Sequence, residues 1–159
     1  MAIDKVRAFF ASFGEDNRII EFPVSSATVA LAAEALKCKP ERIAKTLSFM
    51  VDEKPILIVA AGDAKIDNKK YKEQFATKAR MLSPEQVSFL IGHEVGGVCP
   101  FAVNPGVTTY LDESLKRFQT VFPACGSSNS AIELTIPELE KYSGFSGWIS
   151  VCKLPDGNP

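Results

Sequence analysis

The sequence has few of the residues on which metal sites and nucleophilic triads depend. His93 is its single histidine, so one chain cannot build a zinc site from two or three imidazoles. The four cysteines lie far apart and form no C-x-x-C pair, which excludes a thioredoxin motif and a zinc knuckle. We interpret them as reduced thiols that serve as small buried hydrophobes. The sequence therefore predicts neither a metal site nor a cofactor.

Several catalytic and targeting signatures are also missing. The absence of G-x-S-x-G, G-x-x-x-x-G-K-[ST] and G-x-G-x-x-G weighs against an α/β-hydrolase, a P-loop nucleotidase and a dinucleotide binder, respectively. No apolar run approaches the ~20 residues of a membrane helix, and the first residues lack the basic-then-apolar order of a signal peptide. We expect a cytoplasmic protein with no membrane partner.

Charge of one sign is not in excess. Eighteen Lys and Arg oppose nineteen Asp and Glu, for a net charge of −1, which excludes a histone-like polycation and an acidic tail protein. We expect no DNA partner, and any nucleic-acid binding must come from a local patch. The one basic cluster runs from Lys65 to Arg80, where a solvated helix face is the ordinary explanation.

Length and hydrophobic pattern predict one α+β domain over residues 1–153, followed by a tail at residues 154–159. We expect a mixed curled sheet or barrel of about six to seven strands with helices packed outside, because short strands outnumber helices. Helices are predicted at residues 2–13, 28–36, 67–75, 83–92 and 137–142, the second capped by Ser25-Ser26. Strands are predicted at residues 18–22, 43–51, 56–61, 98–103, 107–111, 120–123, 131–135 and 148–152.

Lys45 is the sharpest anomaly in this pattern. It follows Ile43-Ala44 and precedes Leu47, within a strand that should be largely buried. A lysine there must either reach the edge of the sheet or pair with an anionic group. An edge-strand lysine that discourages aggregation would explain it without any function, so both interpretations stay open.

Two loops of small residues offer polar groups that a ligand could use. Gly96-Gly97 leaves backbone N–H groups open to an anion or a carbonyl oxygen, as in an oxyanion hole, although a plain turn has the same sequence. The segment from Gly126 to Ser130 offers hydroxyls and an amide, and a hairpin connection explains it equally well. His93 fits a loop histidine or a helix C-cap as well as a catalytic base.

These features together, in their order along the chain, resemble a known family. The segments that carry the resemblance are Pro40-Glu41-Arg42-Ile43-Ala44-Lys45-Thr46-Leu47, Gly62-Asp63, Gly96-Gly97-Val98-Cys99-Pro100 and Gly126 … Ile132-Glu133-Leu134. They resemble the YbaK family of aminoacyl-tRNA editing domains, which also occurs inserted in bacterial prolyl-tRNA synthetases. The resemblance spans nearly the whole chain, from the first predicted strand to Cys152.

The resemblance implies a free-standing deacylase that hydrolyses the ester of a mischarged tRNA carrying a small amino acid. Lys45 matches the residue most closely tied to activity, and the loop from Gly96 to Pro100 matches the G-x-x-x-P segment that positions the ester. An aminoacyl ester is already activated, so a placed water, a stabilised oxyanion and a held 3′ terminus can suffice. The implied partners are the acceptor end of mischarged tRNA and, as a further candidate, an aminoacyl-tRNA synthetase.

The resemblance assigns expected roles to named residues. Lys45 is the catalytic candidate. The expected substrate-binding residues are Thr28, Thr46, Gly96, Gly97, Val98, Cys99, Pro100, Gly126, Ser127, Ser128 and Asn129. The expected contacts to the tRNA acceptor stem are Lys65, Lys69, Lys70 and Lys72, since phosphate neutralisation supplies sequence-independent affinity.

The edited amino acid and two other classes of function stay open. Members that remove cysteine have an aromatic residue near Thr28, and a serine and an acid near Ala124 and Ala131, which this chain lacks. Thr46 replaces the asparagine that follows the lysine in alanine-removing members, which makes seryl- or threonyl-tRNA an option. The alternatives to a deacylase are a non-hydrolytic tRNA- or synthetase-binding module and a domain that binds a free amino acid or nucleotide.

Overall fold

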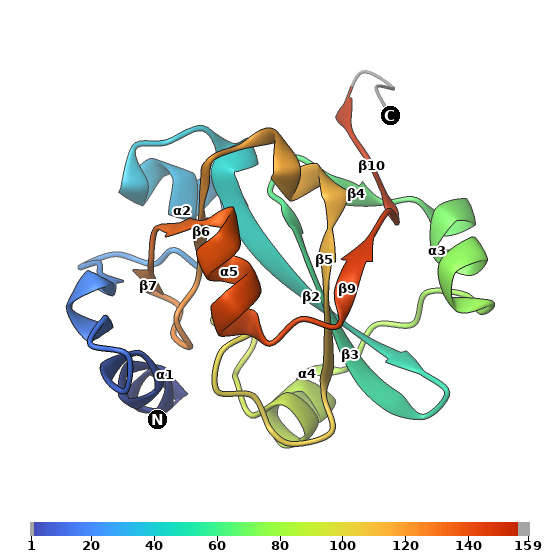
Figure 1. Cartoon of the computed structure of the whole chain (residues 1–159), viewed down its shortest axis with the longest axis horizontal. Coiled ribbons are helices and arrows are strands. Elements are labelled where there is room, and N and C mark those ends of the chain that lie inside the picture. Colours follow the sequence, from blue (N-terminus) through green and yellow to red (C-terminus); the bar gives the residue numbers. More distant parts are fainter. Residues whose placement is uncertain (1, 156–159) are drawn as a thin grey trace.

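A curled six-stranded sheet organises the protein, whose computed structural model describes residues 2–155 (Figure 1). The strand order is β8-β6-β2-β3-β5-β9. These strands are β2 (Ile43–Val51), β3 (Lys54–Ala61), β5 (Thr108–Asp112), β6 (Thr120–Pro123), β8 (Leu134–Thr135) and β9 (Gly147–Ile149). The sheet is mixed: β2 pairs antiparallel with β3 and β6 pairs antiparallel with β8, whereas the β6–β2, β3–β5 and β5–β9 pairs are parallel. The predicted α+β class with a mixed, curled sheet is therefore confirmed.

Two short strand pairs lie outside this sheet. One joins β1 (Ile20–Glu21) to β7 (Ser130–Ala131), and the other joins β4 (Lys65–Ile66) to β10 (Cys152–Lys153). The first pair ties the segment before the second helix to the segment after β6. The second ties the chain that follows β3 to the end of the described chain.

Capping residues, prolines and glycines mark the ends of the helices. They are α1 (Ala2–Ala11), α2 (Val29–Leu36), α3 (Asn68–Phe75), α4 (Pro84–Gln86) and α5 (Ile136–Ser143), and a π-helical turn at Val87–Ile91 extends α4. Single turns of 3₁₀ helix lie at Asp16–Arg18, Pro40–Arg42 and Glu113–Arg117. Ser83 and Gln86 form a capping box before α4, and Gly92 ends its extension with a φ of 93°.

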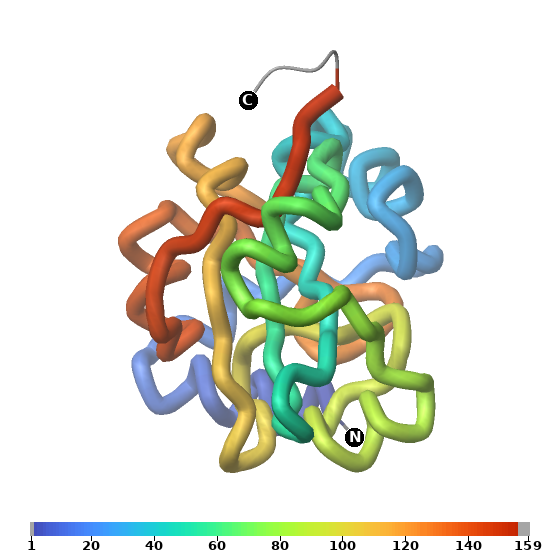
Figure 2. The backbone as a smooth tube through the Cα atoms, turned by 90° about the vertical axis from the view of Figure 1, so that its right-hand side faces the viewer, coloured from blue at the N-terminus to red at the C-terminus, as the bar shows by residue number. Residues whose placement is uncertain are grey.

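The β2–β3 hairpin lies at the centre of the core. Figure 2 shows it running down the middle of the molecule. Its two turn residues, Asp52 and Glu53, have φ values of 50° and 63°, the left-handed conformation that a tight hairpin turn requires. The apolar run from Ile56 to Ala61 is at most 4% exposed, as expected for a strand covered on both faces.

Aromatic side chains attach the outer helices to this core. Phe10 of α1 packs edge-on against Phe101 at 4.9 Å and against Tyr142 of α5 at 5.1 Å between ring centroids. On the other side, Tyr71 of α3 lies 5.2 Å from Phe49 of β2. These contacts fix the helices around the sheet, and buried rings of this kind supply much of the hydrophobic stabilisation of a domain.

Five sequence expectations are corrected. The strand predicted at residues 98–103 is a loop, whose Cys99, Pro100 and Phe101 are buried without strand pairing. The strands predicted at 131–135 and 148–152 are each broken into two short strands, and the one predicted at 18–22 is reduced to two residues. Thr28, rather than Ser25-Ser26, caps α2 by accepting from the Leu31 N–H at 3.1 Å.

The explanation of Lys45 as a residue of an outer strand is also wrong, because β2 lies between β6 and β3. At the other end of the chain, Leu154 of the expected tail packs against the core. Residues 156–159 of that tail lie outside the described residues.

Candidate functional site

A cavity of about 350 Å³ opens between the start of α2, the strand β2 and the loop that precedes Cys99. The segment from Met81 to Val87 closes one end, and the junction of β6 with β7 closes the other. Its polar lining residues are Ser26, Thr28, Lys45, Thr46, Ser48 and Ser130. Most of the remaining lining is aliphatic, so a small ligand would meet an apolar wall with a few polar groups, which is typical of small-molecule sites.

Lys45 carries the one charge in this lining. Its Nζ donates to the backbone carbonyl of Gly62 at 3.3 Å and to that of Ala64. Burial lowers the pKa of Lys45, which means that the folded protein solvates the ammonium less well than water does. The ammonium is therefore oriented by peptide dipoles, and no carboxylate of residues 2–155 forms an ion pair with it.

The carboxylate nearest in sequence to these carbonyls is already engaged. Asp63 lies between Gly62 and Ala64, and Arg117 donates to its two oxygens at 2.5 and 3.1 Å. This pairing lowers the pKa of Asp63 and fixes the turn after β3. Asp63 thus orients the carbonyls that hold Lys45, and it also contributes a favourable electrostatic interaction to the ammonium.

Gly62 fits its position because a side chain would have no room. A Cβ there would lie 2.0 Å from the Pro40 carbonyl oxygen and 2.8 Å from a methyl of Val29. The turn after β3 therefore packs directly against the 3₁₀ turn before β2. The roles of Gly62 and Ala64 as carbonyl partners escaped the sequence analysis, where the only signal was the Gly62-Asp63 pair within the family resemblance.

The loop from Gly96 to Pro100 and the loop from Gly126 to Ser130 are called the two glycine loops below. The first forms one wall of the cavity, and the second supports that wall. Gly96 and Val98 line the cavity, whereas Gly97 is buried against the second loop. A Cβ on Gly97 would lie 2.6 Å from the Ser127 backbone nitrogen and 2.8 Å from the Gly126 carbonyl carbon. The Ser26 N–H also donates to the Ser128 carbonyl at 2.6 Å, which ties the second loop to the chain before α2.

Gly126, Ser127, Ser128 and Asn129 do not line this cavity. Together with Gly97 they line a neighbouring cavity of about 490 Å³, which Lys5 and His93 also line. Asn129 donates to the Phe22 carbonyl at 3.0 Å through its amide. The structure therefore assigns the second loop a supporting position behind the Gly96 wall.

Cys99 and Pro100 lie below the cavity wall instead of in its lining. Both are buried, and the Cys99 thiol lies 3.5 Å from His93 Nε2. Burial raises the pKa of Cys99 to about 12, so this residue is a neutral thiol at physiological pH. These two residues hold the loop in place and do not face the space in which a ligand would lie.

His93 is neither an exposed loop histidine nor a helix cap. It is 1% exposed, its Nε2 lies 2.8 Å from the Phe101 carbonyl oxygen, and Gly92 takes the capping position. Burial lowers the pKa of His93, which favours the neutral ring. His93 does not line the Lys45 cavity, so the geometry gives it no place as a base for chemistry beside Lys45.

The two threonines named from the sequence do line the cavity. Thr28 lies at its rim and uses its hydroxyl to cap α2. Thr46 follows Lys45 on β2, and its hydroxyl is buried with no hydrogen-bond partner among the described residues. Thr28, Lys45, Thr46, Gly96 and Val98 are thus the sequence-predicted residues that the structure brings together.

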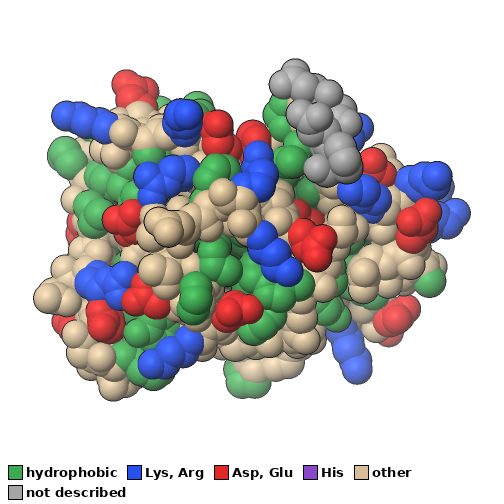
Figure 3. Space-filling view, turned by 45° about the horizontal axis from the view of Figure 1, so that its top comes forward, with side chains coloured by type: hydrophobic (Ala, Val, Ile, Leu, Met, Phe, Trp, Pro, Cys, Tyr) green, Lys and Arg blue, Asp and Glu red, His purple; other side chains and the backbone are tan. Residues whose placement is uncertain are grey.

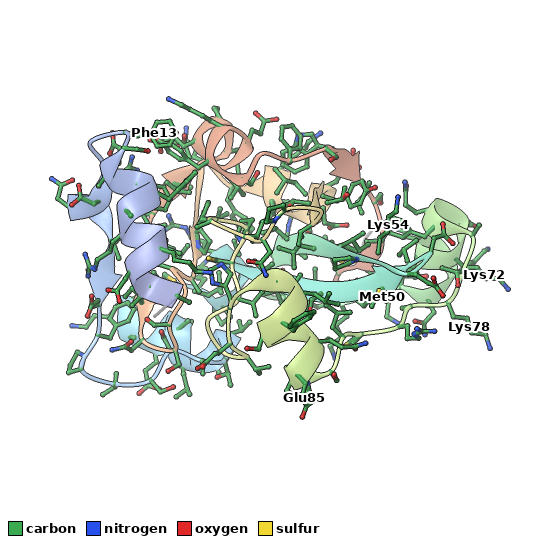
Figure 4. The ribbon with its side chains drawn as sticks, turned by 90° about the horizontal axis from the view of Figure 1, so that it is seen from below. Phe13, Met50, Lys54, Lys72, Lys78 and Glu85 are labelled. Atoms are coloured by element: carbon green, nitrogen blue, oxygen red, sulfur yellow. The ribbon has the colours of Figure 1, made fainter. Side chains whose placement is uncertain are left out.

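The basic cluster is only partly free at the surface, because one of its lysines is engaged by the fold. Lys65, Lys69 and Lys72 are exposed, whereas Lys70 donates to the Cys152 carbonyl at 3.0 Å and so fixes β10. In Figure 4, Lys72 and Lys78 point outward at the end of the molecule that carries α3. Figure 3 shows basic and acidic side chains interspersed over the face that it presents. Lys65 is the member of this cluster whose charge acts on Lys45.

The described residues form neither a metal-binding cluster nor a membrane-spanning helix. Over residues 2–155, no three His, Cys, Asp or Glu side chains come together as a metal site would require. Within the same residues, no helix is both long and apolar enough to span a membrane.

The family resemblance is confirmed by direct matching. The aminoacyl-tRNA editing domain family matches residues 24–142, which include Lys45 and both glycine loops. This match covers well over half of the sequence, so the chain belongs to the aminoacyl-tRNA editing domain family.

Individual relatives agree with this membership. An uncharacterised protein of Bacillus subtilis (strain 168), YwhH, is 56% identical over 154 residues, which cover 96% of this chain and 98% of YwhH. The proline–tRNA ligase of Geobacillus sp. (strain WCH70) is 26% identical over 133 residues, which cover 83% of this chain and 23% of the ligase. A solved structure provisionally described as a trans-editing enzyme for prolyl tRNA synthetase superposes with a TM-score of 0.82 at 27% identity, covering 92% of this chain and 94% of that one.

Proposed function

We propose that the protein is an aminoacyl-tRNA deacylase that removes a small amino acid from mischarged tRNA. The observation that carries this proposal is the Lys45 ammonium in the wall of a small cavity, held by two backbone carbonyls and bonded to no carboxylate of the described residues. Family membership and the similarity to a proline–tRNA ligase and to a trans-editing structure support the same substrate class. Such a substrate implies the cytoplasmic location that the sequence predicts.

The chemistry required is ester hydrolysis. A water oxygen adds to the ester carbonyl carbon, the bond to the ribose oxygen breaks, and a proton passes from the water to that oxygen. The products are a free amino acid and a tRNA with a free terminal hydroxyl. Two protein functions suffice for this reaction: holding the acceptor end and stabilising negative charge on the carbonyl oxygen.

The cavity offers a group for each function. Lys45 would bind a phosphate or another oxygen of the acceptor end through its ammonium. The backbone N–H groups of Gly96 and Val98 would hold the ester carbonyl, because both residues line the cavity. The Gly97 N–H, which the sequence also suggests, already donates to the Glu94 carbonyl at 3.0 Å. The RNA's own 2′-hydroxyl would help to orient the water. Thr28 and Thr46 would line the space for the amino-acid side chain, and the loop from Gly126 to Asn129 would keep the Gly96 wall in position.

The size of the edited amino acid is the second part of the proposal. Its volume of about 350 Å³ must hold the aminoacyl group and part of the terminal ribose. Discrimination by one or two methylenes is worth only ~1–3 kcal/mol, and an editing site exists to add a second discrimination of this kind. We therefore propose substrates among alanine, serine, threonine and cysteine.

The test is single-turnover deacylation of tRNAs charged with Ala, Cys, Ser, Thr or Pro. We expect accelerated loss of one or two of the small amino acids relative to spontaneous hydrolysis in buffer. Unaccelerated hydrolysis across the panel, with tRNA still bound in a filter-binding assay, would replace the deacylase with the non-hydrolytic binding module. The panel should be repeated with a prolyl-tRNA synthetase present, to detect delivery of the substrate by such a partner.

A further inference from the structure

We infer that an open stretch of the β2 edge, at Thr46, recognises the aminoacyl group through two backbone hydrogen bonds. The inference rests on the proposed deacylase function and names the part of the substrate that this wall of the cavity binds.

One edge of β2 is fully occupied. The strand pairs with β3 from Ala44 to Val51 without interruption. In an antiparallel ladder, the N–H and C=O of successive residues point alternately to the two edges of the strand. Met50 donates its N–H to the Arg80 carbonyl at 2.9 Å, and the Ser48 carbonyl accepts from the Leu82 N–H at 3.2 Å. Residues 46, 48 and 50 therefore direct their peptide groups away from β3.

The other edge is paired at both ends and open between them. Pairing with β6 is limited to Ile43 and Ala44, and pairing resumes at the bridge between Phe49 and Met81. Among the described residues, the Thr46 N–H and C=O have no hydrogen-bond partner on this edge.

Pro84 explains why the second partner strand stops short. Continuing the Phe49–Met81 register would bring residue 84 opposite Thr46. A proline has no N–H to donate, and Pro84 starts α4, so the chain turns away from β2 at this point. The sequence therefore sets the end of pairing on this side of Thr46.

The gap coincides with the cavity. Ala44 and Ala124 line it at the β6 end, Leu82 and Pro84 line it at the other end, and Thr46 lies between them. A residue whose N–H and C=O both face an open space is half of a hydrogen-bonded pair of an antiparallel ladder. Peptide ligands that add a strand to a sheet use this arrangement.

An aminoacyl group supplies the missing half. It carries an acceptor, the ester carbonyl oxygen, and a donor, the α-amino group, on adjacent carbons, as a residue of a strand does. The Thr46 N–H would donate to the ester oxygen and the Thr46 C=O would accept from the amino group. Among the described lining residues there is no carboxylate, so a backbone carbonyl is the acceptor that suits an amine. The second lone pair of the ester oxygen stays open to the Gly96 wall.

The first test compares two stable probes by NMR, 3′-alanylamido-3′-deoxyadenosine and its propionyl counterpart, which lacks only the α-amino group. We expect the alanyl probe to slow hydrogen exchange of the Thr46 amide by about tenfold or more, while the Leu47 amide, which faces β3, serves as the internal reference. The propionyl probe should bind about tenfold or more weakly, because a bond to a charged donor is lost.

The outcomes separate this inference from the deacylase proposal. An alanyl probe that shifts Val95 and Ala124 but leaves Thr46 exchange unchanged overturns the inference and leaves the deacylase standing. Equal affinity for the two probes does the same. If neither probe binds, the inference also fails, and turnover of whole aminoacyl-tRNA then decides the deacylase proposal separately.

A variant provides a second route. Thr46→Pro removes the N–H that faces the cavity and none that faces β3, so the ladder is preserved. We expect single-turnover deacylation to fall by about tenfold or more, with the far-ultraviolet circular dichroism spectrum unchanged. Undiminished turnover in this variant contradicts the proposed hydrogen bond.

Discussion

Lys45 and Arg18 are both partly buried cations, and they are held in opposite ways. Arg18 donates to the Glu138 carboxylate at 2.6 Å, to Glu15 at 3.1 Å and to the Glu133 carbonyl at 2.7 Å. Among the described residues, Lys45 donates to the carbonyls of Gly62 and Ala64 alone, and it lines the cavity. One cation is paired with carboxylates, and the other is oriented by peptide dipoles.

The pKa shifts express the same difference. The hydrogen bond to Glu138 raises the pKa of Arg18, and the reciprocal bond lowers the pKa of Glu138 to about 2. Burial lowers the pKa of Lys45. A charge that stabilises the fold is matched by opposite charge, whereas a charge kept unmatched in a cavity costs stability and stays available to a ligand. The contrast favours a structural role for Arg18 and a functional one for Lys45.

The largest expected effect in a test of this contrast is that of Lys45→Ala. We expect Lys45→Ala to reduce single-turnover deacylation by about 100-fold or more, because the placed charge is lost from the site. Its unfolding free energy should change by no more than about 1 kcal/mol, because the lost hydrogen bonds are offset by the removal of a poorly solvated charge. Lys54→Ala, an exposed lysine on the same hairpin, is the matched control and should retain full turnover.

The carbonyls that hold Lys45 can be disturbed only through the backbone. Gly62→Ala places a Cβ against the Pro40 carbonyl, so the turn must shift. We expect a loss of about 1–3 kcal/mol in urea unfolding, together with a loss of turnover in the molecules that stay folded. Gly147→Ala is the control, since a Cβ there meets nothing within 4 Å. Full turnover in a Gly62→Ala protein would show that Lys45 does not need these carbonyls in their present position to function.

Arg18→Ala should give the reverse of Lys45→Ala. We expect it to lower the unfolding free energy by about 1–2 kcal/mol, after allowance for its partial exposure, because Glu138 and Glu15 lose a shared partner. Glu138 also completes the capping box of α5 with Thr135, so the loss should loosen that helix. Turnover per folded molecule should be unchanged. A stable Arg18→Ala protein with impaired turnover would place Arg18 in the functional machinery.

Acid should weaken the Arg18 cluster selectively. The pKa of Glu138 is about 2 in the folded protein and 4.5 for a glutamate without these interactions. The stability that Glu138 contributes to the fold is therefore complete above pH 4.5 and is lost as the pH falls toward 2. We expect Glu138→Gln to lose less stability than the wild type between pH 5 and pH 3 in urea unfolding. Parallel curves for the two proteins would show that this ion pair does not couple to folding.

The smallest expected effect concerns the exposed lysines. Removal of Lys65, Lys69 or Lys72 should each reduce the slope of log affinity for tRNA against log salt by about 0.7–0.9, the value for one phosphate contact. Lys65→Ala should have the larger effect on affinity, since the charge of Lys65 already acts on Lys45. Identical salt slopes for these variants and for Lys54→Ala would show that the cluster is a solvated surface that does not contact tRNA.

The regular parts of the fold were predictable from sequence because local chemistry determines them. The capping residue, proline and terminal glycine around α4 mark its start and end, and the buried run from Ile56 to Ala61 marks β3. The loop after Gly97 was mistaken for a strand because Cys99, Pro100 and Phe101 are buried by packing and not by pairing. An apolar run has the same appearance in both cases.

The site was predictable in part. Lys45 and Gly96 were identified as residue types in unusual places, and the structure brings both to one cavity. The groups that orient Lys45 are backbone carbonyls of Gly62 and Ala64, which leave no trace in residue type. The open edge at Thr46 escapes sequence analysis for the same reason, because it depends on where two distant segments stop pairing with β2.

The most direct test of the account measures turnover and stability on the same preparations of Lys45→Ala and Arg18→Ala. We expect Lys45→Ala to unfold near the wild-type urea midpoint and to lose the acceleration of deacylation. We expect Arg18→Ala to unfold at lower urea and to retain wild-type single-turnover rates at a temperature where it is folded. Wild-type turnover in Lys45→Ala would contradict the central claim that the unpaired ammonium in the cavity carries the function.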